Sequence, residues 1–420
     1  MTRAKPAAPR PAADDNASPA STHLRATDLR GVGRLAVDAT IALTDLAENL
    51  HATILRGRAP LGAETVGGAG GLTGQVYDGV RAVTRGVGHG MEALFNPLLA
   101  LLGPAEGEKL PASPERLAVL AALNGVLGDR LAAQDNPLAL AMHLSHQGTP
   151  LALAAGEPGI APATVPAPGG RLLILVHGLC MHGGQWVRDG NDLGATLAAA
   201  GGFTPLALTY NSGLAIAENG RQFALQLQAL VAAWPVKVDE LLLVGHSMGG
   251  LVARSAIGVA ERDGLRWRRR LGALVTIGTP HEGAPLERGG QWIDQLLGAS
   301  PYSAAFARLG RVRSEGINDL RDARVVADGA WLPLPEGVDC YAVAGVLGGR
   351  GDGLQAALIG DGLVPRDSAL GHHRLHARRL AFPETHQFVA EDCGHLALIA
   401  SPAVAAQLVQ WLVPPAGCRP

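Results

Sequence analysis

The chain contains few cysteines, and none of them stands in a metal-binding arrangement. Its 420 residues include four, at Cys180, Cys340, Cys393 and Cys418, with no C-x-x-C pair among them. This pattern favours free thiols in a reducing compartment over a disulfide framework or a zinc site. No H-E-x-x-H motif occurs, and the histidines of GHHRLHARR (371–379) are as typical of a solvated loop as of a ligand set. We therefore expect neither a metal nor a cofactor.

The chain also has little net charge and no long hydrophobic run. Its formal charge is −2, whereas nucleic-acid binders usually carry a basic face, so nucleic acid is not an expected partner. No window holds the roughly 18 apolar residues that would predict a transmembrane helix, and peripheral membrane contact stays open. Residues 1–28 mix Pro, Ala and charge without the apolar core of a secretory signal, which predicts a disordered tail. A cytoplasmic location is the expectation.

Hydrophobic residues make up 47% of the chain, enough at this length for a sizeable core. Between 29 and 135, apolar residues recur at three- and four-residue spacing in three stretches, which predicts three amphipathic helices. Their stripes are, in order, Leu43, Leu46, Leu50 and Ile54; Val76, Val80, Val83, Val87, Met91 and Leu94; and Leu117, Leu120, Leu123, Leu127 and Leu131. The segment 142–153 then predicts a short hairpin about Gly148 and Thr149.

From 137 to 420 the pattern changes to short apolar runs that alternate with helical segments. Such an alternation is typical of a mostly parallel sheet with helices on both faces, an α/β fold. The segment 285–331 interrupts it with Arg-rich helical sequence and predicts a cap inserted over one end of the sheet. The runs are RLLILVHG (171–178), FTPLALTY (203–210), ELLLVGH (240–246), ALVTIGT (273–279), CYAVAG (340–345) and HQFVAED (386–392).

The stretch LLLVGHSMGGLVARSA (241–256) carries the strongest chemical signal. A buried strand runs into Gly-His-Ser-Met-Gly, and a helical pattern follows, which is the strand-turn-helix context of a nucleophile elbow. Bulky residues at Gly245 or Gly249 would clash with the neighbouring strand and helix. Ser247 is therefore the predicted nucleophile, held in a strained conformation at the N-terminus of a helix whose dipole favours developing negative charge.

A serine hydroxyl needs a base to accept its proton and a third group to hold that base. In this topology the acid and then the histidine follow the serine along the chain. His395 lies just past the last apolar run and just before the terminal helical pattern, as this order requires. It is favoured over the histidine in the last predicted strand and those of the Arg-rich loop, which are His386, His372, His373 and His376.

Asp361 is the predicted acid. It stands in the Gly-flanked loop GDGLVPRDS (360–368) after the fifth apolar run. Leu363, Val364 and Pro365 can anchor this loop against the sheet, as a base-orienting carboxylate requires. Asp352, in RGDGLQ (350–355), is the alternative, but it lacks such an anchor.

Backbone N–H groups at two turns are the predicted oxyanion hole. A His-Gly step follows the first long apolar run directly, so the N–H of Leu179 can point at the same site as the N–H of Met248. Each such donor is worth on the order of 3 kcal/mol of transition-state stabilisation. The adjacent Cys180 is expected to pack and not to act as a nucleophile, since no Gly-x-Cys-x-Gly elbow frames it.

These pieces together resemble the α/β-hydrolase superfamily, and more narrowly a bacterial lipase and esterase group similar to the GPI inositol-deacylase-like lipases. The resemblance spans about 142 to 420 and implies a triad of Ser247, Asp361 and His395 with an oxyanion hole at Leu179 and Met248. It leaves the three N-terminal helices unexplained. The matching segments are LVHGL (175–179), GHSMGG (245–250), IGTPHEGAPL (277–286, whose His281 is expected to be a loop residue near the site), DGLVP (361–365) and GHLALI (394–399).

The expected activity is hydrolysis of a carboxylic ester, of a small molecule or a lipid, through an acyl-enzyme. A thioesterase or an acyltransferase would use the same triad. A binding or scaffold role for the N-terminal helices is the alternative of a different class, although their mixed charges disfavour docking on anionic lipid. No pattern in the sequence fixes the natural substrate, the acyl chain length or the oligomeric state.

Overall fold

The computed structural model describes residues 25, 27–28, 30–38, 40–41, 44, 75–86, 89, 112–153, 165–283, 295, 313–348, 360–373 and 375–413. The chain forms two compact units, Met1–Arg116 and Leu117–Pro420. In the first unit, 30–38 and 75–86 are helical, within the stretches where the first two helices are predicted. Much of their predicted stripes lies outside the described residues: Leu43, Leu46, Leu50, Ile54, Val87, Met91 and Leu94. Asp352 and Cys418 lie outside them as well.

The second unit is built on a mostly parallel sheet. Within the described residues, eight strands pair in the order β10-β9-β8-β7-β3-β6-β1-β2, parallel except for β1, which is antiparallel to β6 and β2. All six predicted apolar runs contribute a strand. The bounds are β1 His143–His146, β2 Thr149–Pro150, β3 Arg171–Val176, β6 Thr204–Thr209, β7 Glu240–His246, β8 Leu271–Ile277, β9 Asp339–Gly345 and β10 Gln387–Ala390; β4 Val187–Arg188 and β5 Asn191–Asp192 form a separate pair.

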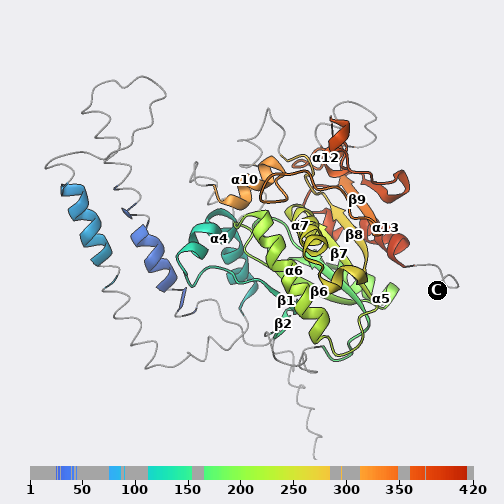
Figure 1. Ribbon diagram of the computed structural model, residues 1–420, viewed down its shortest axis with the longest axis horizontal. Helices are drawn as coiled ribbons and strands as arrows, with labels where there is room; N and C mark the ends of the chain where they lie inside the picture. Colours follow the sequence, from blue (N-terminus) through green and yellow to red (C-terminus); the bar gives the residue numbers. More distant parts are fainter. Residues whose placement is uncertain are drawn as a thin grey trace, which may run out of the picture. The chain divides into compact units, whose positions relative to one another are not determined.

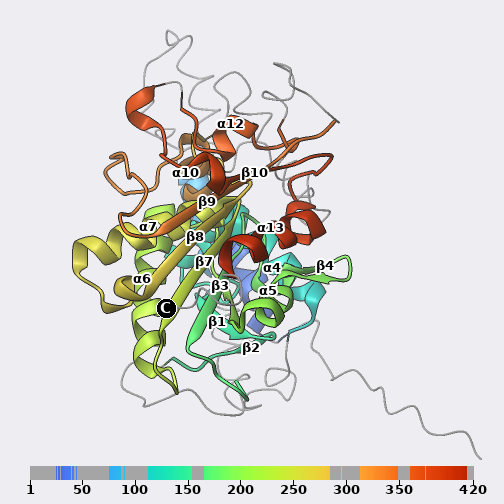
Figure 2. The ribbon, with the colours of Figure 1, turned by 90° about the vertical axis from the view of Figure 1, so that its right-hand side faces the viewer.

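Helices cover both faces of the sheet, as the continuous apolar runs predict. Leu172, Ile174 and Val176 of β3 pack into one core cluster with α6 and α7, while Leu173 and Leu175 pack into the other with α5 and α13. Figure 2 shows these two helix pairs on opposite sides of the strands. The helices are α4 Pro114–Ala133, α5 Leu193–Gly201, α6 Ile216–Ala233, α7 Met248–Asp263, α10 Glu315–Asp322, α12 Arg366–Ala369 and α13 Pro402–Leu412, with short 3-10 turns at Gly183–Trp186, Arg266–Arg270, His376–Arg378, Glu384–His386 and Leu398–Ala400 (Figure 1).

Local signals account for several element ends. Asp192 caps α5 by accepting the Ala195 N–H, and Ser401 does the same for α13. The predicted hairpin is present, with its turn one residue earlier than expected. Gln147 and Gly148 both have positive φ, 48° and 79°, the combination that a two-residue type I′ turn requires.

The predicted cap is described only in part. Of the segment 285–331, the structure describes residue 295 and residues 313–331, and these include α10. Asp319 of α10 accepts the N–H of Ile216, the first residue of α6. The described end of this segment therefore caps a core helix. Within the described ranges, no helix combines the length and the apolar character that crossing a bilayer demands.

Helix α4, the third predicted helix, packs into the core of the second unit from Leu117 onward. Its buried side chains include Leu120, Leu123 and Val126. Asn124, fully buried, donates from Nδ2 to the Leu138 carbonyl at 2.7 Å and accepts the Leu140 N–H at 2.9 Å. These hydrogen bonds leave no buried amide atom of Asn124 unpaired, so the helix is joined to the chain that follows it by polar as well as apolar contacts.

A chain that begins at Pro137 should therefore fail to fold stably. Each large apolar side chain lost with α4 removes about 1.5–3 kcal/mol of burial, and a few of them equal much of the roughly 5–15 kcal/mol that stabilises a typical domain. Soluble yield and thermal unfolding by circular dichroism measure this, with a chain beginning at Ala112 as the control. A cooperative transition at the control's temperature in the shorter chain would contradict the prediction.

Candidate active site

Ser247 occupies the sharp turn between β7 and α7. Its backbone has φ 52° and ψ −125°, which non-glycine residues rarely adopt. This conformation is strained and persists only where the surrounding structure holds it. The Ser247 N–H donates to the Ile277 carbonyl at 2.8 Å, and the Ser247 carbonyl accepts the Gly250 N–H at 3.1 Å. These bonds hold the turn in place against strand β8.

The glycines around Ser247 are needed for close backbone approach. A Cβ added at Gly245 would lie 2.5 Å from the Gly250 nitrogen, and one added at Gly249 would lie 2.2 Å from the Val176 carbonyl oxygen. Both distances are too short for any side chain. The elbow therefore requires glycine at these two positions for the steric reason that the sequence indicates.

Asp361 and His395 form a buried hydrogen-bonded pair. The Nδ1–H of His395 donates to Oδ2 of Asp361 at 2.7 Å. Oδ1 of Asp361 accepts the N–H groups of Leu363 at 3.0 Å and Val364 at 2.8 Å, and Val364 is itself buried in the core. The loop thus fixes the carboxylate, and the carboxylate fixes the orientation of the imidazole.

Ser247 lies beside this pair. His246, the residue before it, donates from Nε2 to the His395 carbonyl at 3.0 Å, and the two rings lie 4.7 Å apart. Gly278, which follows the strand that binds the Ser247 N–H, approaches the pair so closely that a Cβ there would lie 3.2 Å from both Asp361 Oδ2 and His395 Nδ1. Within the described residues, His395 Nε2 is buried and has no hydrogen-bond partner.

Both predicted oxyanion donors adjoin Ser247. Met248 is the first residue of α7. Leu179 follows Gly178, and a Cβ added at Gly178 would lie 3.0 Å from the Ser247 Cβ. The turn after β3 and the turn after β7 therefore meet at the serine, at the carboxyl ends of neighbouring parallel strands.

The other candidate histidines lie elsewhere. His386 donates from Nδ1 to the Cys340 carbonyl, 3.1 Å away, and its ring packs on Tyr341. His372 and His376 are exposed, and His373 is half-buried. In the part of the chain that the structure describes, none of them forms a hydrogen bond or an ion pair with Ser247 or Asp361. The alternative acid, Asp352, lies outside that part.

His281 is a buried loop residue next to a buried arginine. Its Nε2 lies 3.3 Å from the Thr276 hydroxyl and its Nδ1 lies 3.3 Å from the guanidinium of Arg254. Arg254, on α7, also donates to the Leu332 carbonyl and lies over the Trp331 ring. Burial lowers the Arg254 pKa to about 10. The sequence does not mark this arginine as buried, because nothing in the helical pattern of α7 distinguishes it from a surface residue.

His177, directly after β3, is another buried group that no sequence pattern marks. Its Nδ1–H donates to the Gly178 carbonyl at 2.8 Å, and its Nε2 accepts the Tyr210 N–H. Its ring stacks on Tyr210 at 4.3 Å. Burial lowers the pKa of His177 to about 3 and that of the neighbouring His182 to about 4. The fold therefore requires His177 in its neutral form.

This requirement predicts acid sensitivity. The His177 pKa is lower in the folded state than the value near 6.5 of an unfolded chain. The contribution of neutral His177 to the free energy of unfolding is therefore complete above pH ~6.5 and is lost as the pH falls toward 3. In His177→Gln, the free energy of unfolding should change less with pH between 6.5 and 4, by up to about 1.4 kcal/mol per pH unit. Urea unfolding across this range measures it, and equal slopes in both proteins would contradict the prediction.

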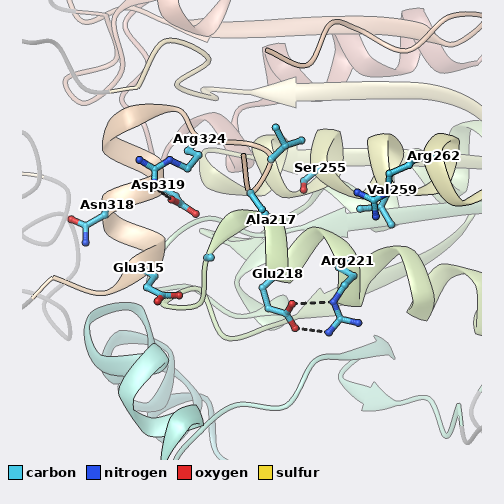
Figure 3. A pocket seen from close by; sticks show the side chains of 13 residues that line it. Ala217, Glu218, Arg221, Ser255, Val259, Arg262, Glu315, Asn318, Asp319 and Arg324 are labelled. Atoms are coloured by element: carbon cyan, nitrogen blue, oxygen red, sulfur yellow. Dashed lines mark hydrogen bonds and ion pairs between the residues drawn. The ribbon is translucent and has the colours of Figure 1, made fainter. Parts of the chain in front are cut away.

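A pocket of about 490 Å³ opens between α6, α7 and α10 (Figure 3). None of the predicted site residues lines it. Ion pairs between acidic and basic side chains on or beside its walls offset one another: Glu218 with Arg221, Asp263 with Arg262, and Asp319 with Arg324. The pocket therefore lies apart from the predicted Ser247 site and has no excess charge of either sign to attract an ionic ligand. Within the described ranges, no three His, Cys, Asp or Glu side chains are grouped as a metal ion would need.

The sheet order, the strained serine turn and the helices on both faces define an α/β-hydrolase fold, and the chain resembles the lipases and esterases of that superfamily. A family profile described as "PGAP1-like alpha/beta domain" matches residues 223–302, which run from α6 through the Ser247 turn into the insertion. No curated protein sequence matches the chain. Solved structures do match it, at low identity.

Three of these structures are as follows. The lipase BlEst2 of Bacillus licheniformis is 17% identical, with a TM-score of 0.42, over 65% of this chain and 98% of that one. An esterase of Thermogutta terrifontis is 15% identical, with a TM-score of 0.35, over 65% and 92%. The mouse alpha/beta hydrolase domain-containing protein 10 is 12% identical, with a TM-score of 0.36, over 59% and 89%.

Proposed function

We propose that the protein is a serine hydrolase that cleaves carboxylic esters through an acyl-enzyme on Ser247. The observation that carries the proposal is the buried 2.7 Å hydrogen bond between His395 Nδ1 and Asp361 Oδ2 beside the strained Ser247 turn. A carboxylate-oriented imidazole next to a serine in such a turn is the arrangement that activates a hydroxyl nucleophile.

In the proposed reaction, the Ser247 hydroxyl oxygen attacks the carbonyl carbon of the ester while its proton passes to His395 Nε2. Asp361 holds the Nδ1–H and stabilises the imidazolium that forms. The N–H groups of Leu179 and Met248 bind the negative oxygen of the tetrahedral intermediate. The alcohol leaves with the proton from His395. Water, deprotonated by His395, then attacks the acyl carbon, and the acid is released with Ser247 restored.

The proposed chemistry acts on the ester bond and does not depend on the alcohol part or the acyl part of the substrate. A small-molecule or a lipid ester fits the proposed chemistry, and we propose the segment 285–331 as the cap whose lining selects the acyl chain. Thioester hydrolysis or transfer of the acyl group to an alcohol would use the same steps with another leaving group or acceptor.

We also propose a reducing, cytoplasmic location, because the cysteines among the described residues are free and buried.

Hydrolysis of p-nitrophenyl esters from acetate to palmitate tests the proposal. We expect turnover with a clear optimum of chain length, which separates an esterase from a lipase. Matching acyl thioesters, and the same esters with added butanol, test the two alternative reactions by product analysis. Preference for the thioester, or butyl ester as the main product, would replace ester hydrolysis by that alternative. No turnover of any of these substrates would favour the binding role of the N-terminal helices.

A further inference from the structure

Helix α4 lies directly against the turn that carries the proposed oxyanion donor Leu179. Gly125 of α4 faces Cys180, and a Cβ added at Gly125 would lie 2.2 Å from the Cys180 sulfur and 3.1 Å from its backbone nitrogen. Cys180 is buried and has φ 58°, a conformation that non-glycine residues rarely hold without support. The chain therefore adopts its unusual backbone next to Leu179 at the point where α4 touches it.

Hydrogen bonds hold Cys180 on two sides. Its Sγ–H donates to the Ala122 carbonyl of α4 at 3.8 Å, within the longer range of hydrogen bonds that involve sulfur. Its N–H donates to the Ser212 hydroxyl at 3.1 Å. Burial raises the pKa of the Cys180 thiol to about 12, so the sulfur stays protonated and serves as a donor. Cys180 is therefore fixed at both its backbone and its side chain.

The loop that contains Ser212 is itself held by α4. Asn211 donates from Nδ2 to the Gly128 carbonyl at 2.8 Å. A Cβ added at Gly213 would lie 2.1 Å from the Asn124 carbonyl oxygen. The helix thus contacts Cys180 directly through Gly125, and it also holds the segment that accepts the Cys180 N–H.

We propose that α4 is a positioning element of the site, and that Gly125 and Cys180 are positioning residues that set the direction of the Leu179 N–H toward the oxyanion. The inference rests on the proposed function. Its physical basis is that an oxyanion donor acts only when it is fixed in advance at 2.7–3.1 Å from the developing charge, and a shift of the order of 1 Å can lower the rate about 100-fold.

Gly125→Ala is the direct test, because its methyl group must displace Cys180. We expect kcat for p-nitrophenyl butyrate to fall about 10- to 100-fold with KM within about 3-fold, since the donor acts in the transition state and not in substrate binding. Butylboronic acid, whose adduct with a serine is tetrahedral, should bind more weakly by a similar factor. Val119→Ala, at a half-exposed position of the same helix, is the control and should match the wild type in both.

A compensating change separates positioning from general damage. Replacement of Cys180 by Gly removes the sulfur that the new methyl group meets, and glycine accepts positive φ freely. In the double variant Gly125→Ala with Cys180→Gly, we expect kcat and boronic acid affinity to rise from the Gly125→Ala level to that of Cys180→Gly alone, which should itself lie about 3- to 10-fold below the wild type. Recovery of the melting temperature without recovery of kcat would overturn the inference.

The remaining outcomes are also decisive. Wild-type kcat and inhibitor affinity in a folded Gly125→Ala protein would overturn the inference while leaving the proposed function intact. If Gly125→Ala does not fold, Cys180→Ala carries the test, with an expected fall in kcat of about 3- to 10-fold, and an unchanged kcat there overturns the inference. If the wild type neither hydrolyses the ester nor reacts with a fluorophosphonate, the proposed function fails, and the inference fails with it.

Discussion

Ser247→Ala is expected to lower kcat/KM for p-nitrophenyl esters by about 10⁴- to 10⁶-fold, because removal of a triad nucleophile eliminates the acyl-enzyme route. The fold should not change, since the turn is held by backbone hydrogen bonds to Ile277 and Gly250 that the substitution retains. Circular dichroism and the melting temperature check the fold, and initial rates check the activity.

Ser255→Ala is the matched control for this variant. Ser255 is buried on the same helix, two turns after Ser247, and it lies away from Asp361 and His395 at the wall of the α6/α7/α10 pocket. It should retain activity near the wild-type value. Activity that survives in Ser247→Ala would exclude Ser247 as the nucleophile.

Asp361→Asn is expected to lower kcat by about 10⁴-fold with little change in KM. The amide can still accept the N–H groups of Leu363 and Val364, but it cannot stabilise the imidazolium of His395 and it favours the wrong tautomer of the ring. Steady-state kinetics at pH 7–9 measure the loss.

Two controls accompany Asp361→Asn. Asp367→Asn alters a half-exposed carboxylate a few residues further along the chain and should leave kcat unchanged. Asp352→Asn tests the alternative acid. A large loss in Asp352→Asn together with near-normal activity in Asp361→Asn would move the acid to Asp352.

The strands of the sheet could be predicted from the sequence because their signal is local. Each of the six apolar runs contributes a strand, and β3, β7, β8 and β9 are buried on both faces. The glycines that flank Ser247 mark a turn in which no side chain fits at Gly245 or Gly249. The Asp361 loop was recognisable for the same reason, since Val364 anchors it within three residues of the carboxylate.

The support around the site could not be predicted, because it consists of contacts between distant parts of the chain. Gly125 meets Cys180 across 55 positions, and neither residue stands in a motif. His246 donates to the His395 carbonyl, 149 positions further along the chain. The sequence pattern predicts the fold but not this contact. The buried Arg254 has no acidic neighbour at helical spacing that would have marked it. Such contacts depend on how elements pack, which periodicity does not encode.

Trapping of the acyl-enzyme tests directly whether Ser247 is the nucleophile. The wild type is mixed with p-nitrophenyl butyrate, quenched in acid within milliseconds and digested, and the peptide that contains Ser247 is analysed by mass spectrometry. We expect a butyryl group on Ser247 in the wild type, a mass gain of about 70 Da. The trapped fraction should be large if deacylation is slower than acylation. Ester turnover with the butyryl group on another residue would contradict the assignment of Ser247.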